Sequence, residues 1–374
     1  MHRNTELIKR ITIKIGTNLL SKDSGINIDF LKKIVAQIHA LQEMGIQVLL
    51  VSSGAIGLGA GELGIIERVK AIPMRQACAS IGQPILMQHY RELFQGVDII
   101  ISQILLTREV LNNRMSFINL KNAVETLLEL HAVPIFNEND SVSTAEIGTA
   151  FGDNDTLSAL IASKTDSDLL VILTDIDGLY DKDPTKENGA VLIPYIEEIN
   201  DEVKSWAGNV SGSTFSTGGM KTKLTAAEIA ASAGCASIIA DGREENILVR
   251  LLKGEQLGTY FAPKDKIPQR IRWIMHTQPS GTLIIDEGAV EALRNKKSLL
   301  PVGVIRVEGV FDRGTVLMIN NVAKAVTSCN SEEIRRIVGH HSSDVRDKIG
   351  SERRALIARP EDIVFLKEPH RMNK

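Results

Sequence analysis

Short apolar runs alternate with longer amphipathic segments from the start of the chain to Tyr260. The runs are rich in Val, Ile and Leu, which is typical of strands buried on both faces; they cover 11–15, 47–51, 98–106, 133–136, 169–173 and 237–240. Between them, apolar residues recur at helical spacing over 29–44, 74–94, 113–131, 156–163 and 221–233. This alternation predicts a three-layer αβα sandwich around a mainly parallel sheet.

The pattern changes after Tyr260. Two prolines and three charged residues fill 263–268, which is typical of a linker. From Pro279 the apolar runs are short, cover 282–286, 302–310, 315–319 and 323–327, and are separated by Gly and Asn. We therefore predict a first domain over 1–262, a linker over 263–278, a small β-rich domain over 279–361 and a C-terminal tail over 362–374.

Composition narrows the class of protein. The 374 residues carry 43 Lys and Arg against 46 Asp and Glu, so net charge indicates neither nucleic acid nor membrane as a partner. Three widely spaced cysteines predict neither a disulfide framework nor a metal site. The first ten residues lack an apolar signal core, and no apolar run reaches the roughly 18 residues of a membrane helix. We expect a cytoplasmic protein.

A glycine-rich stretch with two lysines precedes the helical segment at 221–233. It consists of Thr217, Gly218, Gly219, Met220, Lys221, Thr222 and Lys223. Glycine permits positive φ, and a helix start offers unpaired N–H groups, so the stretch suits phosphate oxygens. It is not a P-loop, because no Gly-x-x-x-x-Gly-Lys-Ser/Thr occurs in the chain. The alternative is a flexible loop that caps an ordinary helix.

Polar residues gather where predicted strands end. They are Ser53, Asn137, Asp140, Thr174 and Asp175. In open α/β sheets, ligands bind beyond the carboxyl ends of the strands. Any one of these residues could simply form a turn or cap a helix. Their occurrence after several strands of one sheet favours a binding site.

One glycine motif matches that of dinucleotide-binding proteins in its residue types but not in its position along the chain. Residues 59–64, Gly-Ala-Gly-Glu-Leu-Gly, match the dinucleotide-binding fingerprint. The motif starts eight residues after Val51 and so lacks the tight strand-to-helix turn. We interpret it as a flexible loop over the site and do not expect a nicotinamide cofactor.

Six motifs, in this order, resemble those of the glutamate 5-kinases. They are 14–17 (Lys-Ile-Gly-Thr), 53–56 (Ser-Gly-Ala-Ile), 137–140 (Asn-Glu-Asn-Asp), 152–155 (Gly-Asp-Asn-Asp), 173–180 with its Leu-Thr-Asp and Gly-Leu-Tyr, and 217–223. The resemblance covers nearly the whole chain and implies the amino-acid-kinase fold. It also implies ATP-dependent phosphorylation of the L-glutamate side-chain carboxylate, the first step of proline biosynthesis. The tail resembles a PUA domain, on Pro279–Thr282 and Asp286–Ala289. One departure is Ser216, where the family usually has glycine.

The resemblance also implies a role for individual residues. Lys14, Lys223 and Asp155 match catalytic positions, with Asp155 holding the two lysines in place. Ser53, Asp140 and Asn154 match glutamate-binding positions. By their chemistry we add Asn137, suited like Asp140 to the ammonium, and the backbone of Gly54 and Ala55, suited like Asn154 to a carboxylate. ATP-binding positions are Lys14, Thr174, Asp175 and the stretch 217–223. Magnesium is expected on the nucleotide phosphates, and we assign it no protein ligand.

The resemblance further implies a homo-oligomer, dimer or tetramer, inhibition by proline and coupling to the next enzyme of the pathway. Aspartokinase, acetylglutamate kinase and uridylate kinase are alternatives with the same fold, but they usually carry Lys-x-Gly-Gly where this chain has Lys14-Ile15-Gly16-Thr17. An RNA-binding protein is another alternative, since residues 280–374 carry a net charge of +3. That segment holds only two aromatic residues for base stacking, Phe311 and Phe365. A catalytically silent amino-acid sensor is the third, and the intact Lys14, Asp155 and Lys223 argue against it.

Overall fold

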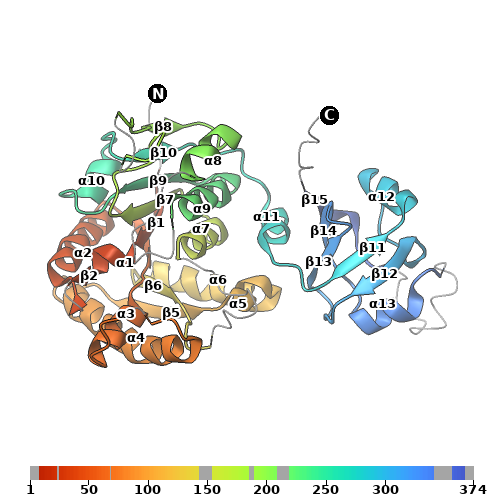
Figure 1. Ribbon diagram of the computed structural model, residues 1–374, viewed down its shortest axis with the longest axis horizontal. Coiled ribbons are helices and arrows are strands. Elements are labelled where there is room, and N and C mark those ends of the chain that lie inside the picture. Colours follow the sequence, from red (N-terminus) through yellow and green to blue (C-terminus); the bar gives the residue numbers. More distant parts are fainter. Residues whose placement is uncertain are drawn as a thin grey trace. The chain divides into compact units, whose positions relative to one another are not determined.

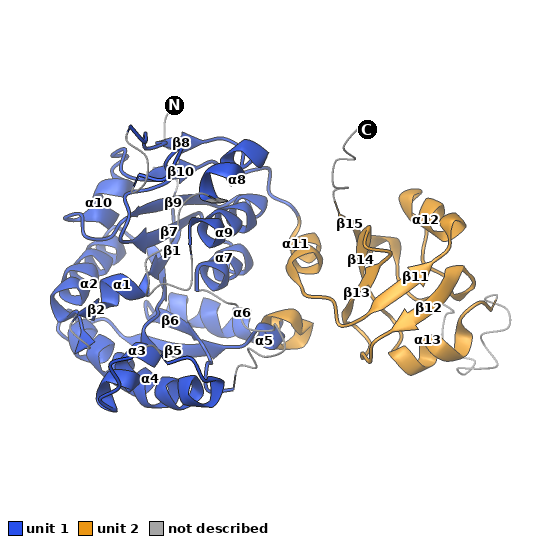
Figure 2. Cartoon of the chain, in the orientation of Figure 1, with its two compact units in different colours: residues 1–110, 118–267 blue, residues 111–117, 268–374 orange. Residues whose placement is uncertain are grey.

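A computed structural model of the chain describes residues 8–22, 25–67, 69–142, 154–184, 189–208, 219–340 and 356–366. The chain divides into two compact units, residues 1–110 with 118–267 and residues 111–117 with 268–374 (Figure 2). Each unit has a sheet of its own. Of the residues singled out from the sequence, Gly152, Asp153, Ser216, Thr217 and Gly218 lie outside the described residues.

The first unit is built on an eight-stranded sheet in the order β5-β6-β4-β1-β7-β9-β10-β8, with β5 and β8 at opposite edges (Figure 1). Its strands are β1 (Arg10–Ile15), β4 (Gln47–Val51), β5 (Ile101–Leu106), β6 (Val133–Glu138), β7 (Leu169–Thr174), β8 (Tyr195–Ile196), β9 (Ala236–Asp241) and β10 (Thr259–Phe261). All neighbours pair in parallel except β10, which runs antiparallel to β9. A two-stranded ribbon, β2 (Ser21–Lys22) with β3 (Gly25–Ile26), stands apart from the sheet.

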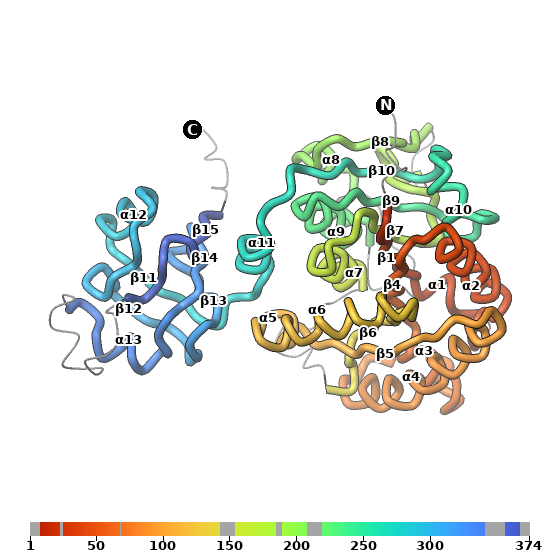
Figure 3. Tube along the Cα trace, turned by 180° about the vertical axis from the view of Figure 1, so that it is seen from behind, coloured from red at the N-terminus to blue at the C-terminus, as the bar shows by residue number. Residues whose placement is uncertain are grey.

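Helices cover both faces of this sheet. They are α1 (Thr17–Leu20), α2 (Ile28–Glu43), α3 (Ala55–Glu62), α4 (Ile72–Gln95), α5 (Arg108–Asn112), α6 (Arg114–Glu129), α7 (Asn154–Lys164), α8 (Asp201–Gly208), α9 (Met220–Ser232) and α10 (Ile247–Leu252). Helices α7 and α9 lie side by side on one face in both views, and α2 and α10 cover the other (Figures 1 and 3). The predicted αβα sandwich with a mainly parallel sheet is confirmed.

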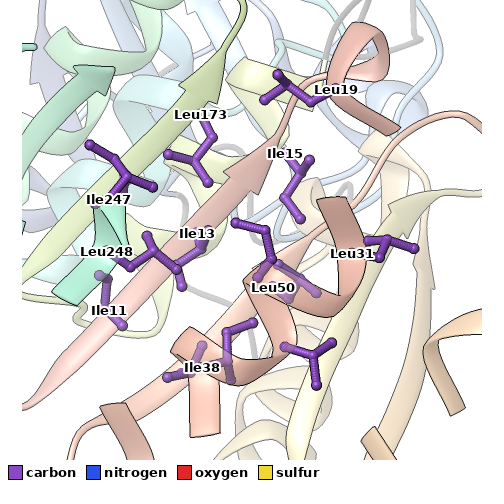
Figure 4. Packing of buried hydrophobic residues seen from close by; sticks show 14 of the residues in the cluster. Ile11, Ile13, Ile15, Leu19, Leu31, Ile38, Leu50, Leu173, Ile247 and Leu248 are labelled. Atoms are coloured by element: carbon purple, nitrogen blue, oxygen red, sulfur yellow. The ribbon is translucent and has the colours of Figure 1, made fainter. Parts of the chain in front are cut away.

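Strand β1 shows how the alternation of side chains divides the two faces. Ile11, Ile13 and Ile15 are fully buried in the core cluster, together with Leu31 and Ile38 of α2 (Figure 4). Successive side chains of a strand point to opposite faces, so Thr12 and Lys14 face α7. A hydrogen bond between Thr12 Oγ1 and Ser167 Oγ, 2.8 Å long, fits that placement. Lys14 is thereby a buried lysine on the face that carries α7 and α9.

The glycine motif at 59–64 is part of a helix pair, and our interpretation of it as a flexible loop is wrong. Gly59 lies in α3, and a Cβ on it would come within 1.9 Å of the Cys78 carbonyl oxygen on α4. A Cβ on Gly82 of α4 would come equally close, 1.9 Å, to the carbonyl oxygen of Ala55. The two glycines therefore allow the backbones of α3 and α4 to approach more closely than any side chain would permit.

The second unit carries a five-stranded sheet in the order β12-β11-β13-β14-β15. Its elements are α11 (Gln269–His276), β11 (Thr282–Ile285), α12 (Glu287–Arg294), η2 (Pro301–Gly303), β12 (Val304–Glu308), β13 (Val316–Ile319), β14 (Ala323–Val326), α13 (Ser331–Ile337), η3 (Pro360–Asp362) and β15 (Ile363–Phe365). Leu283, Leu317 and Ile334 belong to its own core. Asp286 caps α12 and Asn330 caps α13, two helices that the short apolar runs did not predict.

The expected linker over 263–278 contains helix α11. Its Trp273 and Ile274 are buried against Val316 and Val326 of the second unit's sheet, and Val364 packs beside them. The compact unit begins at Pro268, which is earlier than the predicted β-rich domain. In the part of the chain described, no helix is long and apolar enough to cross a membrane.

Candidate active site

Three charged side chains from distant parts of the sequence meet at the carboxyl edge of the main sheet. Lys14 Nζ lies 2.6 Å from Asp155 Oδ1, and Lys223 Nζ lies 3.1 Å from Asp155 Oδ2. Thr222 Oγ1 donates a third bond to Asp155 Oδ2 at 3.0 Å. The Asp155 side chain is 0% exposed and the two lysine side chains are 5% and 7% exposed. This triad, Lys14–Asp155–Lys223, has one positive charge in excess.

Each member of the triad is positioned by a different element. Lys14 is near the end of β1, whose register pairs it with Val51 and Ile172 in the centre of the sheet. Asp155 is in the first turn of α7. Lys223 is in the first turn of α9, which packs on α7. Removing one partner of a buried ion pair costs roughly 3–5 kcal/mol, so all three groups must be kept for the triad to be stable.

A second cluster, built from amides and hydroxyls, adjoins the triad through the neighbouring residue of α7. Asn154 Nδ2 donates to the Ser52 carbonyl at 2.5 Å, to Ser53 Oγ at 3.1 Å and to Asn137 Oδ1 at 2.9 Å. Ser52 and Ser53 follow β4, and Asn137 lies on β6. The first two residues of α7 thus serve two different clusters, Asp155 the triad and Asn154 this amide cluster.

The role that we assigned to Asn154 changes. Its Nδ2 group was expected to donate to a substrate carboxylate, but three acceptors of the protein take up that group. All the side-chain hydrogen bonds that Asn154 makes with other described residues involve Nδ2, so Oδ1 is left to accept from a bound ligand. An acceptor at this position suits an ammonium group better than a carboxylate.

Gly54 and Gly219, two glycines of the site, differ in backbone conformation. Gly54 has φ +92°, a left-handed conformation that favours glycine, and it turns the chain from β4 into α3 at Ala55. Gly219 precedes α9 with φ −82° and ψ −175°, so the expected positive φ is not used there. A Cβ on Gly219 would meet nothing within 4 Å, which leaves open space at the start of α9. Met220 is buried and Lys221 is exposed on that first turn.

Asp175 forms a third polar cluster, beyond β7. It accepts from Asn18 Nδ2 at 2.8 Å and from Thr174 Oγ1 at 3.1 Å, and its carbonyl accepts from Arg243 Nη2 at 2.8 Å. Burial raises the pKa of Asp175, but the bonds from Asn18 and Thr174 and the charge of Lys223 outweigh it and lower the pKa below its usual value. Asp175 is therefore a carboxylate at neutral pH.

Asp140 lies beyond the end of β6 among charged neighbours. Burial and the nearby Glu138 raise the pKa of Asp140 to about 6, while Arg75 opposes the shift. Glu138 in turn raises the pKa of Arg108, although burial lowers it overall. Leu106 pairs with Glu138 in the sheet, which brings the end of β5, and Arg108 at the start of α5, next to this group. A cationic ligand beside Asp140 would lower its pKa again, because a nearby positive charge stabilises the ionised carboxylate.

The structure supplies no ready-made cage for a metal. Among the residues described, no three His, Cys, Asp or Glu side chains are grouped so that they could hold an ion. Asp155 and Asp175, two carboxylates that interact with the triad's lysines, each accept hydrogen bonds from the protein. A magnesium ion that keeps most of its waters and phosphate ligands fits such a site.

Two family profiles cover most of the sequence. The profile of the amino acid kinase family matches residues 9–241, and that of the PUA domain matches residues 281–349. The chain belongs to the amino acid kinase family. All three members of the triad lie within the matched part of this amino acid kinase.

Curated relatives extend the similarity to the full length of this amino acid kinase. It is 44% identical over 369 residues to a protein named glutamate 5-kinase from Methanosarcina barkeri, covering 95% of this chain and 96% of the relative. It is also 44% identical over 352 residues to a glutamate 5-kinase from Geobacter sulfurreducens, covering 92% and 94%. The resemblance to the glutamate 5-kinases read from the sequence motifs is confirmed.

A solved structure supports the fold of the kinase part. Carbamate kinase from Giardia lamblia, bound to AMP-PNP, superposes with a TM-score of 0.50 at 18% sequence identity. The match covers 69% of this chain and 99% of the carbamate kinase. At this identity it bears on the architecture alone.

Several polar residues near the site were not singled out from the sequence. Asn18 and Arg243 follow β1 and β9, so the rule that ligands gather at strand ends could have found them. Gln83 lies within the long helix α4, and its buried amide bonds to Asn137. No local pattern marks a glutamine in an amphipathic helix as part of a site, and only the three-dimensional structure brings it there.

Proposed function

We propose that this amino acid kinase transfers the γ-phosphoryl group of ATP to the side-chain carboxylate of L-glutamate. A bond forms between a carboxylate oxygen and the γ-phosphorus, the bond to the β–γ bridging oxygen breaks, and the products are L-glutamyl 5-phosphate and ADP. The observation that carries the proposal is the buried triad at the sheet edge, in a chain 44% identical to named glutamate 5-kinases. The proposed pathway role is the first step of proline biosynthesis.

The chemistry requires charge compensation rather than a base. A glutamate side chain has a free pKa near 4.3, so the nucleophile is already ionised at neutral pH. The barrier is the approach of that anion to a negatively charged phosphate tail, which fixed positive groups reduce. We assign this role to Lys14 and Lys223, and we assign to Asp155 the role of holding both ammonium groups in place.

The nucleotide and its metal are assigned to the α9 side of the triad. The N-terminus of α9, which Gly219 precedes, offers backbone N–H groups to phosphate oxygens. Thr174 and Asp175, with their bonds to Asn18 and Arg243, are assigned to the nucleoside part. Magnesium would reach the site on the phosphates and offset their charge there.

L-Glutamate is assigned to the amide cluster and to Asp140. The Asn154 Oδ1 acceptor and the Asp140 carboxylate suit the α-ammonium group. The turn at Ser53, Gly54 and Ala55 offers N–H and O–H donors for a carboxylate. Ser53 Oγ already accepts from Asn154, so its own hydrogen is available to a ligand.

A competition between acceptors tests this function. ADP release should be measured with L-glutamate, L-aspartate, N-acetyl-L-glutamate and UMP, each with Mg²⁺-ATP, and hydroxylamine should be added to trap an acyl phosphate as its hydroxamate. We expect release and hydroxamate with L-glutamate far above the other three. Preference for any other acceptor would replace glutamate as the substrate while leaving the family unchanged.

The remaining assignments are predictions from the sequence. They are the domain bounds 1–262, 263–278, 279–361 and 362–374, a homo-oligomer, inhibition by proline, coupling to the next enzyme and a cytoplasmic location. Binding of RNA through the PUA domain is a second candidate function, which the few aromatic residues of this segment disfavour.

A further inference from the structure

Gln83 connects helix α4 to the amide cluster. Its Oε1 accepts from Asn137 Nδ2 at 2.8 Å in a buried bond, and its Nε2 donates to Gln103 Oε1 at 3.1 Å. A chain of hydrogen bonds therefore runs from Gln103 on β5 through Gln83 and Asn137 to Asn154 and Ser53. None of these links contains a charged group.

The backbone fixes the direction of this chain. The Glu138 N–H donates to Asn137 Oδ1 at 3.0 Å, and a backbone N–H can only donate. The oxygen of the Asn137 amide must therefore face Glu138 and Asn154, and its nitrogen must face Gln83. Asn154 must then present Nδ2 to Asn137, and its Oδ1 is the acceptor that we assign to the ligand.

Helix α4 also positions the other wall of the cluster. Gly82, next to Gln83, lets the α4 backbone reach the first turn of α3, where a Cβ would come within 1.9 Å of the Ala55 carbonyl oxygen. Ser52, which precedes that turn, is bonded through Oγ to the Tyr90 hydroxyl of α4 at 2.9 Å. One rigid helix therefore contacts both the Ser53–Gly54–Ala55 turn and Asn137.

We propose that Gln83 is a positioning residue that sets the amide orientation of Asn137 and, through it, of Asn154, and so determines the affinity for the amino-acid substrate. It touches neither ligand. Without the Gln83 acceptor, the Asn137 amide has a buried donor that is no longer satisfied and can rotate to an orientation in which Asn154 loses its partner. This inference rests on the proposed function, since it concerns the substrate of that same site.

The test compares Gln83→Met with Gln88→Met. Methionine keeps the length of the side chain and removes both hydrogen bonds. Gln88 is on the same helix and is exposed, and its side chain bonds only to Glu92 among the described residues, so its variant controls for the substitution itself. We expect Gln83→Met to raise KM for glutamate about tenfold with KM for ATP changed less than twofold, and Gln88→Met to change neither.

A double variant separates positioning from a general structural effect. In an Asn137→Ala background the further change Gln83→Met should leave KM for glutamate within twofold, because Gln83 acts through Asn137. Full additivity of the two effects, or an equal rise in both KM values for Gln83→Met alone, would overturn the proposal. If Gln83→Met does not fold, Gln83→Asn, one methylene shorter, is expected to show the same selective rise, and an unchanged KM for glutamate there would also overturn it.

Failure of the proposed function can be distinguished from failure of the positioning role of Gln83. A wild-type protein that releases no ADP with glutamate removes the glutamate assignment before any variant is compared. A wild type active on glutamate whose Gln83 variants behave like the Gln88 control removes only the positioning role.

Discussion

The triad and the amide cluster occupy one sheet edge and are built from opposite kinds of groups. The triad holds two ammonium groups around a carboxylate that is 0% exposed. The amide cluster holds Asn154, Asn137 and Ser53 together with neutral hydrogen bonds alone. The two clusters meet at the start of α7, where Asn154 and Asp155 are consecutive.

The contrast follows from what each cluster has to recognise. Phosphoryl transfer spreads negative charge over several oxygens, and compact point charges stabilise it without demanding one geometry. An amino acid of fixed shape is better selected by oriented donors and acceptors, because an unsatisfied buried polar group penalises the wrong ligand. We therefore expect changes in the triad to act on turnover and changes in the amide cluster to act on the affinity for glutamate.

The largest effect is expected in the triad. Lys14→Ala and Lys223→Ala should each lower kcat by roughly 100-fold or more, the usual cost of losing one charged contact in the transition state. Steady-state kinetics with Mg²⁺-ATP and glutamate measure it. Lys32→Ala, an exposed lysine on α2, is the control and should match the wild type. A folded Lys223→Ala protein with near wild-type kcat would show that this lysine has another role.

The next largest effect is expected on stability, when the close packing of α4 on α3 is disrupted. Gly82→Ala places a methyl group 1.9 Å from the Ala55 carbonyl oxygen and should lower the free energy of unfolding by at least ~1–3 kcal/mol. Urea unfolding measures the change. Gly57→Ala, in α3 with nothing within 4 Å of the added Cβ, should be neutral or slightly stabilising. Equal stability of the two variants would contradict the close approach of the helices.

Sequence patterns located most strands of the first unit's sheet but not β8 and β10, and the family resemblance named the three residues that meet in the triad. The Val, Ile and Leu runs located β1, β4, β6, β7 and β9 because strands buried on both faces leave a strong local signal. They did not locate α12 and α13, which are short and capped by single polar residues. Residues 98–100 are apolar in part but lie before β5, and Asp98 has φ +57°.

The parts of the site that could not be predicted depend on contacts between distant residues. Gln83 and Asn137 are 54 positions apart, and nothing near either one indicates their hydrogen bond. The direction of the Asn154 amide is set by Ser52, Ser53 and Asn137 together, so a reading of one motif at a time assigned its donor to the ligand. Glycine is required at 59 because α4 lies against that position, and at 82 because α3 lies against it, so neither requirement can be found from the local sequence.

A smaller effect is expected at Asp140, and it depends on pH. The raised pKa, about 6, means that Asp140 becomes neutral as pH falls through that value and then loses its attraction for the substrate ammonium group. We expect kcat/KM for glutamate to fall below pH 6 and Asp140→Asn to lower it about tenfold at pH 7.5, with KM for ATP unchanged. The pH profile of Asp140→Asn should lack the fall near pH 6. A change confined to KM for ATP would place Asp140 in the nucleotide site.

The smallest effect on turnover is expected from removing most of the second unit. A chain that ends at Ile267 keeps both clusters, so we expect it to fold and to phosphorylate glutamate. Activity and urea unfolding of the purified fragment measure both. A chain that ends at His276 retains Trp273 and Ile274 without Val316 and Val326, so we expect it to aggregate. A soluble, folded and inactive fragment ending at Ile267 would show that the second unit takes part in catalysis.

The division of labour between the clusters can be measured directly by titrating L-glutamate into the protein without nucleotide, by calorimetry. The wild type, Lys223→Ala and Asn137→Ala should be compared in the same buffer. We predict that Lys223→Ala binds glutamate with a Kd within threefold of the wild type although its kcat is lost, and that Asn137→Ala binds at least tenfold more weakly. Weakened binding in Lys223→Ala together with unchanged binding in Asn137→Ala would contradict the account.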